Sequence, residues 1–194
     1  MTEPLILASG SPRRRQLLEM LRVPFRVIVP DVDERAALAG ELPDAYVTRL
    51  SRAKAEVVVA RAPGEVILAA DTTVALDGEI FGKPDSPADA VAMLLRLQGR
   101  THEVMTAVAV ARDAEVAQAL DVSRVTLRPA DRATLEAYVA TGEPLDKAGA
   151  YAIQGLGAPL IDRVEGDFFG VMGLPVRLAL DLLARFGRAY RFIR

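Results

Sequence analysis

Residues 5–15 read Leu-Ile-Leu-Ala-Ser-Gly-Ser-Pro-Arg-Arg-Arg, and this stretch indicates how the fold begins. The apolar run Leu5–Ala8 predicts a buried strand that ends at a Ser-Gly-Ser turn. Pro12 then predicts a helix start, because proline lacks the N–H that is unpaired at the first helical position, and Ser11 is a suitable N-cap. A strand, a turn and a basic helix start together suit a polyanion such as a nucleotide phosphate chain.

The helical phase after Pro12 separates three consecutive arginines. The inward side of this helix is set by three leucines, Leu17, Leu18 and Leu21. Arg13 and Arg14 project to either side of that inward arc, whereas Arg15 falls on the opposite face. We therefore expect Arg13 and Arg14 to be the anion ligands and Arg15 to be solvated. A basic helix start that is solvated throughout is the alternative.

Composition limits the classes of fold and site. A chain of 194 residues suits one domain over residues 1–194, with room for two lobes around a cleft. It has no cysteine, which excludes disulfides, thiolate metal sites and cysteine nucleophiles. The single histidine, His102, excludes a multi-histidine zinc site.

Charge and hydropathy narrow the range of partners. The net charge of −2 gives no basic footprint for duplex nucleic acid, and an aromatic content of 5% fits poorly with single-strand binding. The beginning of the sequence lacks the pattern of a signal peptide, and no apolar stretch approaches the ~18 residues of a membrane span. We expect a cytoplasmic protein with no membrane association and no stable nucleic-acid binding.

Apolar runs and helical periodicities alternate along the chain. Strands are predicted at residues 5–8, 25–29, 66–70, 104–111, 122–127 and 160–164. Helices are predicted at residues 12–21, 44–60, 87–97, 132–140 and 175–186, the third with Ser86 as N-cap. Asp77-Gly78 and Glu165-Gly166-Asp167 are typical of hairpin turns. Hairpins among interleaved strands and helices indicate an α/β fold with a mixed sheet flanked by helices.

Lys54 interrupts the apolar face of the second predicted helix. Leu50 and Val58 belong to that face, and Lys54 lies near its middle, whereas Arg52 lies on the outer side. The lysine could extend along the helix to reach water. Alternatively, the helix borders a cleft in which Lys54 meets an anion or a carboxylate, since a buried ammonium without a partner is costly.

Asp71 and Thr72 follow the buried strand predicted at residues 66–70. The carboxyl ends of strands in α/β sheets are where ligands bind, so Asp71 is a candidate to hold a divalent metal or to accept a proton from an attacking water. An aspartate that merely ends the strand is the alternative. Lys83, in the Gly82-Lys83-Pro84 loop, is a candidate site residue only if it lies near Arg13, Arg14 and Lys54.

Two further segments contain polar candidates. Residues 31–35 form an acidic run in which one carboxylate could complete a metal site with Asp71, although a solvated loop fits the residue types better. In the glycine-rich segment 146–157, Gln154 offers the donor and the acceptor that recognition of a base edge requires. For His102, a structural hydrogen bond is a better expectation than catalysis.

Several short motifs occur in order along nearly the whole chain. They are Leu7-Ala8-Ser9-Gly10-Ser11-Pro12-Arg13-Arg14, Asp33-Glu34-Arg35, Ala53-Lys54-Ala55, Ala70-Asp71-Thr72, Gly82-Lys83-Pro84, Gly99-Arg100-Thr101-His102-Glu103-Val104, Asp146-Lys147-Ala148-Gly149-Ala150-Tyr151-Ala152-Ile153-Gln154-Gly155 and Gly173-Leu174-Pro175. Each motif alone is weak, but as a set they resemble the Maf family of nucleoside triphosphate pyrophosphatases. The resemblance implies an α/β fold with a mixed, twisted sheet flanked by helices and a central cleft, similar to that of inosine triphosphate pyrophosphatases. It also implies hydrolysis between the α- and β-phosphates with a divalent cation, Mg²⁺ or Mn²⁺, and it suggests a homodimer.

The resemblance also implies roles for individual residues. Asp71 matches the family's proton acceptor and Glu34 a carboxylate near the metal, so that Glu34 and Asp71 are the expected metal ligands. Arg13, Thr72 and Gln154 match positions that select the base, and this form of the late motif looks like the dTTP/UTP branch. The remaining substrate-binding positions are Ser9, Ser11, Arg14, Lys54 and Lys83. A nucleotide-sensing regulatory protein of cell division or septum formation is the alternative function.

Overall fold

The computed structural model describes residues 3–33 and 37–192. Within these residues, seven strands form one mixed sheet, in the order β2-β1-β3-β5-β6-β7, with β4 paired to β3. The strands are β1 (Leu5–Ala8), β2 (Phe25–Val27), β3 (Ile67–Leu76), β4 (Glu79–Phe81), β5 (Thr101–Arg112), β6 (Glu115–Leu127) and β7 (Ile161–Glu165). β1 runs parallel to β2 and β3, and the remaining pairs are antiparallel. The predicted α/β class with a mixed sheet is confirmed.

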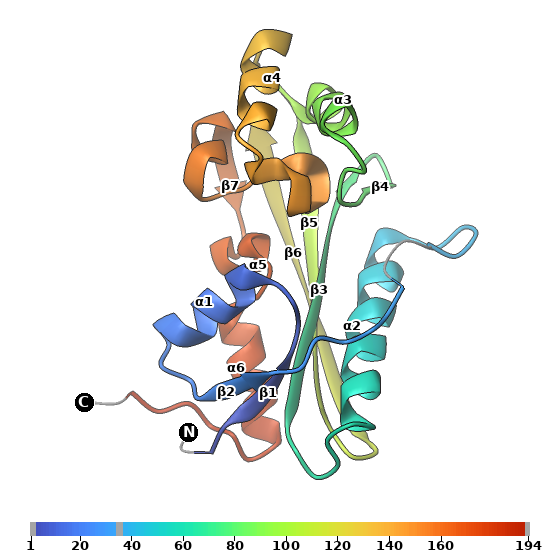
Figure 1. The fold of residues 1–194 in the computed structure, drawn as a ribbon, viewed down its shortest axis with the longest axis vertical. Coiled ribbons are helices and arrows are strands. Elements are labelled where there is room, and N and C mark those ends of the chain that lie inside the picture. Colours follow the sequence, from blue (N-terminus) through green and yellow to red (C-terminus); the bar gives the residue numbers. More distant parts are fainter. Residues whose placement is uncertain (1–2, 34–36, 193–194) are drawn as a thin grey trace.

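Helices cover the sheet in two groups (Figure 1). The helices are α1 (Pro12–Met20), α2 (Pro43–Val59), α3 (Pro87–Leu97), α4 (Arg132–Ala140), α5 (Phe168–Met172) and α6 (Val176–Arg185). We call the part with β1, β2, α1, α2 and α6 the lower lobe, and the part with β4, β7, α3 and α4 the upper lobe, as they lie in Figure 1. The long strands β3, β5 and β6 run through both lobes and join them.

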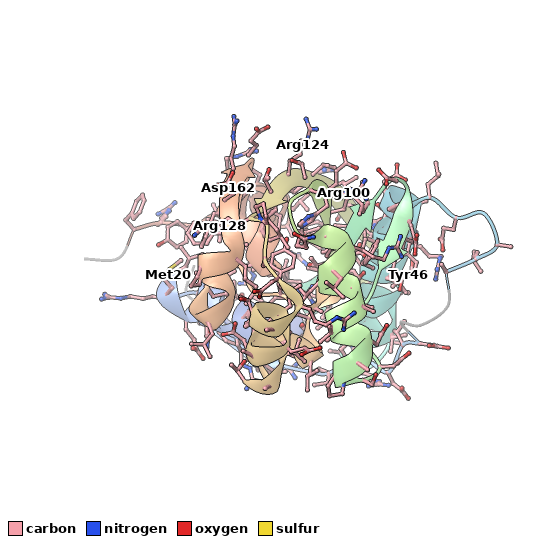
Figure 2. The ribbon with its side chains drawn as sticks, turned by 90° about the horizontal axis from the view of Figure 1, so that it is seen from above. Met20, Tyr46, Arg100, Arg124, Arg128 and Asp162 are labelled. Atoms are coloured by element: carbon pink, nitrogen blue, oxygen red, sulfur yellow. The ribbon has the colours of Figure 1, made fainter. Side chains whose placement is uncertain are left out.

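Each lobe has its own apolar core. In the lower lobe, Leu17 and Leu18 of α1 pack with Leu182 and Leu183 of α6 against one face of the sheet. Residues of α2 pack on the other face. In the upper lobe, α3 and α4 enclose a second cluster around Leu94. The charged side chains of Arg100, Arg124 and Asp162 lie on the outside of the molecule (Figure 2).

Two of the helix starts follow directly from the sequence. The Ser11 Oγ accepts a hydrogen bond from the Arg14 N–H at 3.5 Å, and Pro12 occupies the first turn of α1. The Ser86 Oγ accepts from the Asp89 N–H at 3.1 Å at the start of α3. Such caps satisfy N–H groups that have no partner inside the helix, which is why the starts of both helices were predictable.

Several predicted boundaries were wrong. β2 ends at Val27, and β5 and β6 extend well beyond their apolar runs because they form one long antiparallel hairpin. The Asp77-Gly78 turn joins β3 to β4 as predicted, with φ angles of 54° and 81°. The turn around Gly166 is not a hairpin: it leads from β7 into α5, where Asp167 accepts from the Gly170 N–H at 2.9 Å as the helix cap.

The largest difference concerns β3, which does not end before Asp71. It continues to Leu76, because residues 67–75 are paired with β5 along one edge. Along the other edge, β1 pairs with residues 67–69 and β4 with residues 74–76. Residues 70–73 therefore have no strand beside them on that edge. Asp71 lies at this gap in the sheet, not at the end of a strand.

Candidate active site in the cleft between the lobes

A cleft of about 1000 Å³ opens at the gap beside β3. Chain segments that are distant in sequence surround it: the turn before α1, the middle of β3, the loop after β4 and the late segment 145–154. Every predicted site residue within the described part of the chain lines this cleft: Ser9, Ser11, Arg13, Arg14, Lys54, Asp71, Thr72, Lys83 and Gln154. Glu34 lies outside the described residues.

Lys54 and Asp71 form a buried ion pair. The Lys54 Nζ lies 2.6 Å from Oδ1 of Asp71, and the two residues are 3% and 6% exposed. Lys54 projects from the buried face of α2, and the neighbouring apolar side chains of that face pack on the sheet. Of the two alternatives for Lys54, contact with a carboxylate is the one that the structure shows. The pair also explains how a carboxylate is tolerated within a buried strand.

Arg14 joins three segments of the chain at the cleft. Its guanidinium donates to the Gly173 carbonyl at 2.7 Å, to the Ser9 Oγ at 3.1 Å and to the Thr72 Oγ1 at 3.1 Å. Thr72 in turn lies 2.9 Å from the Thr106 Oγ1. Arg14 is only 8% exposed. Through these hydrogen bonds it holds the turn before α1 and the turn before α6 against β3. Arg15 is exposed, as the helical phase predicts.

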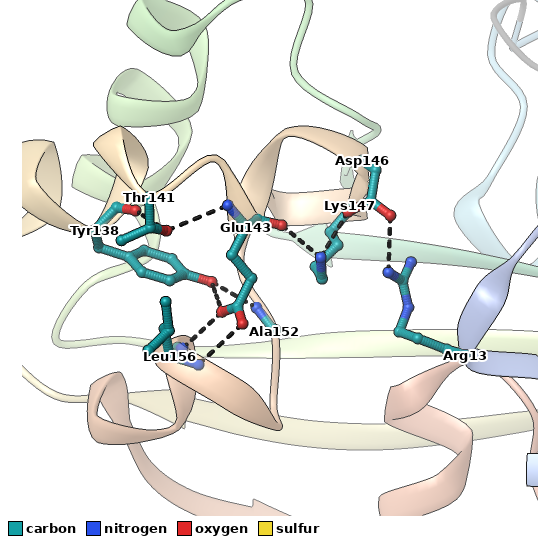
Figure 3. A network of polar contacts seen from close by, with 9 residues as sticks. Arg13, Tyr138, Thr141, Glu143, Asp146, Lys147, Ala152 and Leu156 are labelled. Atoms are coloured by element: carbon teal, nitrogen blue, oxygen red, sulfur yellow. Dashed lines mark hydrogen bonds and ion pairs between the residues drawn. The ribbon is translucent and has the colours of Figure 1, made fainter. Parts of the chain in front are cut away.

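Arg13 contacts Asp146 in the late segment 145–154 (Figure 3). Its Nη1 is 3.0 Å from Oδ2 of Asp146, which ends the 3₁₀ turn η1 (Glu143–Asp146). The Lys147 Nζ lies 2.6 Å from Oδ1 of the same carboxylate. Burial alone would raise the pKa of Asp146, but Lys147 and Arg13 outweigh it and lower the pKa. Asp146 is therefore a carboxylate at neutral pH, and it links the lower and upper lobes.

Lys83 and Gln154 also line the cleft. Lys83 is exposed in the loop that follows β4, and Gln154 is half-buried at the start of the 3₁₀ turn η3 (Gly155–Leu160). Lys147, to which the sequence assigned no role, lines the same cleft. The structure thus brings lysines of both lobes and the Gln154 amide to one cavity.

His102 contributes to structure, as expected, and does not line the cleft. Its Nε2 lies 2.7 Å from the Tyr151 hydroxyl, and the two rings meet edge to face at 5.3 Å between centroids. Burial lowers the pKa of His102 to about 4, so the imidazole is neutral at physiological pH. Tyr151 does line the cleft, so this contact supports one of its walls.

The Maf-like protein family matches residues 4–186. The chain belongs to this family. It is similar to proteins named dTTP/UTP pyrophosphatase from Symbiobacterium thermophilum (48% identical, covering 95% of both chains) and from Myxococcus xanthus (51% identical, covering 94% of this chain and 92% of the relative). It is also 50% identical to a protein from Methylobacillus flagellatus that is likewise named dTTP/UTP pyrophosphatase. That alignment covers 95% of this chain and 94% of the relative.

The fold of this Maf-like chain is also found in a solved structure. The Staphylococcus aureus Ham1 protein aligns with a TM-score of 0.54 over 95% of this chain and 97% of its own, at 16% sequence identity. The arrangement of a mixed sheet with flanking helices is thus shared, whereas most of the sequence differs. No helix within the described part of the Maf-like chain is both long and apolar enough to span a bilayer.

The acidic groups of the Maf-like cleft fit a hard divalent cation in part. Within residues 3–33 and 37–192, no three His, Asp or Glu side chains gather as a complete ligand set. Asp71 and Asp33 nevertheless both line the cleft. Mg²⁺ is commonly bound by one or two carboxylates and otherwise by water and substrate phosphates. The oxygen chemistry of the cleft therefore fits a cation that arrives with a nucleotide.

Proposed function

We propose that this Maf-like protein hydrolyses dTTP and UTP to the nucleoside monophosphate and pyrophosphate. One observation carries the proposal: the buried pair of Lys54 and Asp71 lies in a cleft that is also lined by Arg13, Lys83 and Lys147. A carboxylate beside several cations suits attack of water on a highly charged phosphate chain. The names of the relatives that are about half identical over nearly the whole chain support the same substrates.

The cations bind and neutralise the triphosphate. Arg13 lies at the start of α1, whose first N–H groups also favour anions. Lys83 and Lys147 line the same cleft. Each charge-assisted hydrogen bond contributes about 1.5–3 kcal/mol net, so phosphate contacts dominate binding. Arg14 supports the site through its contacts with Ser9 and Thr72, and Ser11 caps the helix.

Asp71 acts on the attacking water. Because the Lys54 ammonium contacts Oδ1, we assign the other oxygen, Oδ2, to the water. A carboxylate that accepts a proton from the nucleophile typically accelerates a reaction by about 10²–10⁴-fold. The position of Asp71 at the gap in the sheet allows this approach, because no neighbouring strand covers residues 70–73 on that edge.

A divalent cation, Mg²⁺ or Mn²⁺, completes the proposed site. Asp71 and Glu34 would hold it, and Asp33 lines the same cleft. The cation would stabilise negative charge on the phosphoryl oxygens and on the leaving pyrophosphate. Gln154 would face the base: its amide can donate to and accept from the edge of thymine or uracil, with Thr72 and Arg13 nearby in the same cleft.

The proposed function is tested by incubating the protein with a panel of nucleoside triphosphates and Mg²⁺. We expect pyrophosphate, and no orthophosphate, from dTTP and UTP, with little product from purine nucleotides. Nucleotide binding without any pyrophosphate would instead support a nucleotide-sensing regulator of cell division. Orthophosphate as the product would show cleavage of the terminal phosphate and would contradict the proposal.

We further infer that the chain acts as one domain, as a homodimer and in the cytoplasm. The likeness to the Maf family supports the dimer, and the nucleotide substrates support the cytoplasm. Light scattering after size-exclusion chromatography would measure the mass in solution. A monomer at working concentration would remove the dimer from the proposal.

A further inference from the structure

Glu143 makes an unusual set of contacts behind the late segment of the cleft. The side chain is half-buried at the start of η1, and its two carboxylate oxygens accept three hydrogen bonds (Figure 3). Oε1 accepts from the Leu156 N–H at 2.9 Å, and Oε2 accepts from the Gly157 N–H at 2.8 Å. The Tyr138 hydroxyl donates to Oε2 at 2.9 Å. Neither Glu143 nor Tyr138 lines the cleft.

Glu143 supplies the cap hydrogen bonds of η3, which the side chain of the N-cap residue, Gln154, does not make. Gln154 occupies the N-cap position of η3, but its own side chain makes no cap hydrogen bond. The N–H groups of Leu156 and Gly157, in the first turn of η3, bond to Glu143 instead. The Gln154 amide is therefore not used for capping, and it is one of the groups that line the cleft.

A second contact holds the chain on the other side of Gln154. The Tyr138 hydroxyl accepts a hydrogen bond from the Ala152 N–H at 3.0 Å while it donates to Glu143. Tyr138 thus binds the backbone at Ala152, before Gln154. Glu143 binds it at Leu156 and Gly157, after Gln154. Glu143 and Tyr138 both come from the upper lobe, in which Tyr138 is buried on α4.

Gly155 and Gly157 show how closely the backbone of this loop approaches Glu143 and Tyr138. Gly155 has a φ of +78°, and a Cβ there would lie 2.3 Å from Oε1 of Glu143. A Cβ on Gly157 would lie 2.4 Å from the Ala152 carbonyl oxygen and 2.6 Å from the Tyr138 hydroxyl. The loop is therefore packed directly on Glu143 and Tyr138, with no space for side chains between them.

The contacts of Glu143 suit a carboxylate. Burial alone would raise the pKa of Glu143, but the hydrogen bonds from Leu156, Tyr138 and Gly157 outweigh it and lower the pKa. The charged form offers acceptor oxygens to all three donors. A glutamine would have to turn its NH₂ group toward a donor at one end, which would leave at least one of these groups without a partner.

We propose that Glu143 is a positioning residue for base selection, which acts through Gln154. Together with Tyr138, Glu143 holds the backbone on both sides of Gln154. It thereby fixes where the Gln154 amide meets the base. The inference rests on the proposed function, in which Gln154 faces the base. Glu143 itself touches neither the base nor the reacting atoms, so its loss should change the choice of nucleotide more than the rate of the chemical step.

Glu143→Gln tests this inference in the 194-residue chain. We measure kcat and KM with dTTP and with dGTP, well below the melting temperature of the variant. The ratio of kcat/KM for dTTP over dGTP should fall by about tenfold or more, mainly through a higher KM for dTTP. Tyr138→Phe, which removes the hydroxyl but keeps Glu143, should cause a smaller fall in the same direction.

Glu79→Gln is the matched control. Glu79 also lies in the upper lobe, where it forms an exposed ion pair with Arg96 at 2.6 Å, and it does not line the cleft. Its substitution should leave the ratio unchanged. An unchanged ratio in Glu143→Gln, or in Tyr138→Phe if the first variant does not fold, would overturn the inference.

Binding of monophosphates separates this inference from the proposed function. Calorimetric titration with dTMP and dGMP requires no turnover, and the same loss of preference for the thymine nucleotide is expected in Glu143→Gln. Absence of pyrophosphate from the wild-type protein would overturn the proposed function alone. An unchanged preference between dTMP and dGMP in the variant would overturn the role of Glu143.

Discussion

The Nζ of Lys54 and the Oδ1 of Asp71 are 2.6 Å apart, and this contact joins α2 to the middle of β3 at the base of the cleft. Both side chains are almost completely buried. Removing one member of such a pair leaves the other charge buried without compensation, so the pair links stability to the proposed chemistry.

Lys54→Met should reduce the free energy of unfolding by about 3–5 kcal/mol, because the Asp71 carboxylate loses its buried partner. Urea denaturation measures the change. Arg52→Met is the matched control on the same helix: Arg52 pairs with Glu56 at 2.7 Å on the exposed side, where such pairs contribute about 0.3–0.5 kcal/mol. Equal losses in the two variants would contradict the importance assigned to the buried pair.

Asp71→Asn should reduce turnover of dTTP by about 10²–10⁴-fold or more, because an amide cannot accept the proton of the attacking water. Nucleotide binding should be largely retained, since the asparagine oxygen can still accept a hydrogen bond from Lys54. Pyrophosphate release measures turnover, and calorimetry with dTMP measures binding. Near-normal turnover would remove Asp71 from the proposed mechanism.

Gln154→Glu should weaken the use of both dTTP and UTP, because a carboxylate cannot donate a hydrogen bond to a uracil or thymine carbonyl. The kcat/KM for each nucleotide, compared with that for purine nucleotides, measures the effect. Gln98 offers a matched control outside the cleft: its side-chain oxygen accepts from the Ala130 N–H at 3.2 Å. Gln98→Glu preserves that acceptor. Unchanged selectivity in Gln154→Glu would exclude Gln154 from base recognition.

Asp146→Asn should lower the KM for dTTP by up to about fivefold, because Asp146 competes with the phosphates for Arg13. The limit follows from the partial exposure of the pair, since exposed ion pairs contribute at most about 1 kcal/mol. The effect should shrink at high salt, where exposed charges are screened. Asp77→Asn, which breaks an outer pair with Arg100, should leave KM unchanged. A higher KM in Asp146→Asn would show that Asp146 assists binding.

His102 should make the protein less stable as the pH falls from about 6.5 toward about 4. The pKa of the buried imidazole is lowered from 6.5 to about 4, so in this window the unfolded chain binds a proton that the folded protein does not. The free energy of unfolding should therefore fall by up to about 1.4 kcal/mol per pH unit. His102→Gln does not titrate, and the difference between its urea denaturation curves and those of the wild type isolates the effect. Parallel pH profiles for the two proteins would contradict this assignment.

The mixed α/β class and much of the candidate site were predictable from local patterns. Ser86 and Pro87 marked the start of α3 because a cap and a proline act within a single turn. The buried side of α1 was predictable from helical phase, which correctly separated Arg14 from Arg15. Lys54 was detectable because a charge in the middle of an apolar face requires a partner.

Pairings between distant segments were not predictable in this way. The 13-residue strand β6 extends far beyond its apolar run because β5 lies beside it. Arg13 and Asp146 are separated by 133 positions, and no local pattern indicates that they meet. Glu143 resembles any surface glutamate in sequence, since its three partners are backbone and hydroxyl groups that only the folded loop brings together.

The sequence by itself determined the secondary-structure class, the basic turn before α1 and the identity of the charged residues that disturb apolar patterns. Only the tertiary structure decided that Asp71 lies at a gap between β1 and β4, within a strand that continues to Leu76. The physical reason is that hydrophobic periodicity reports which side of an element is buried, whereas the neighbours along a strand edge depend on how remote segments pair.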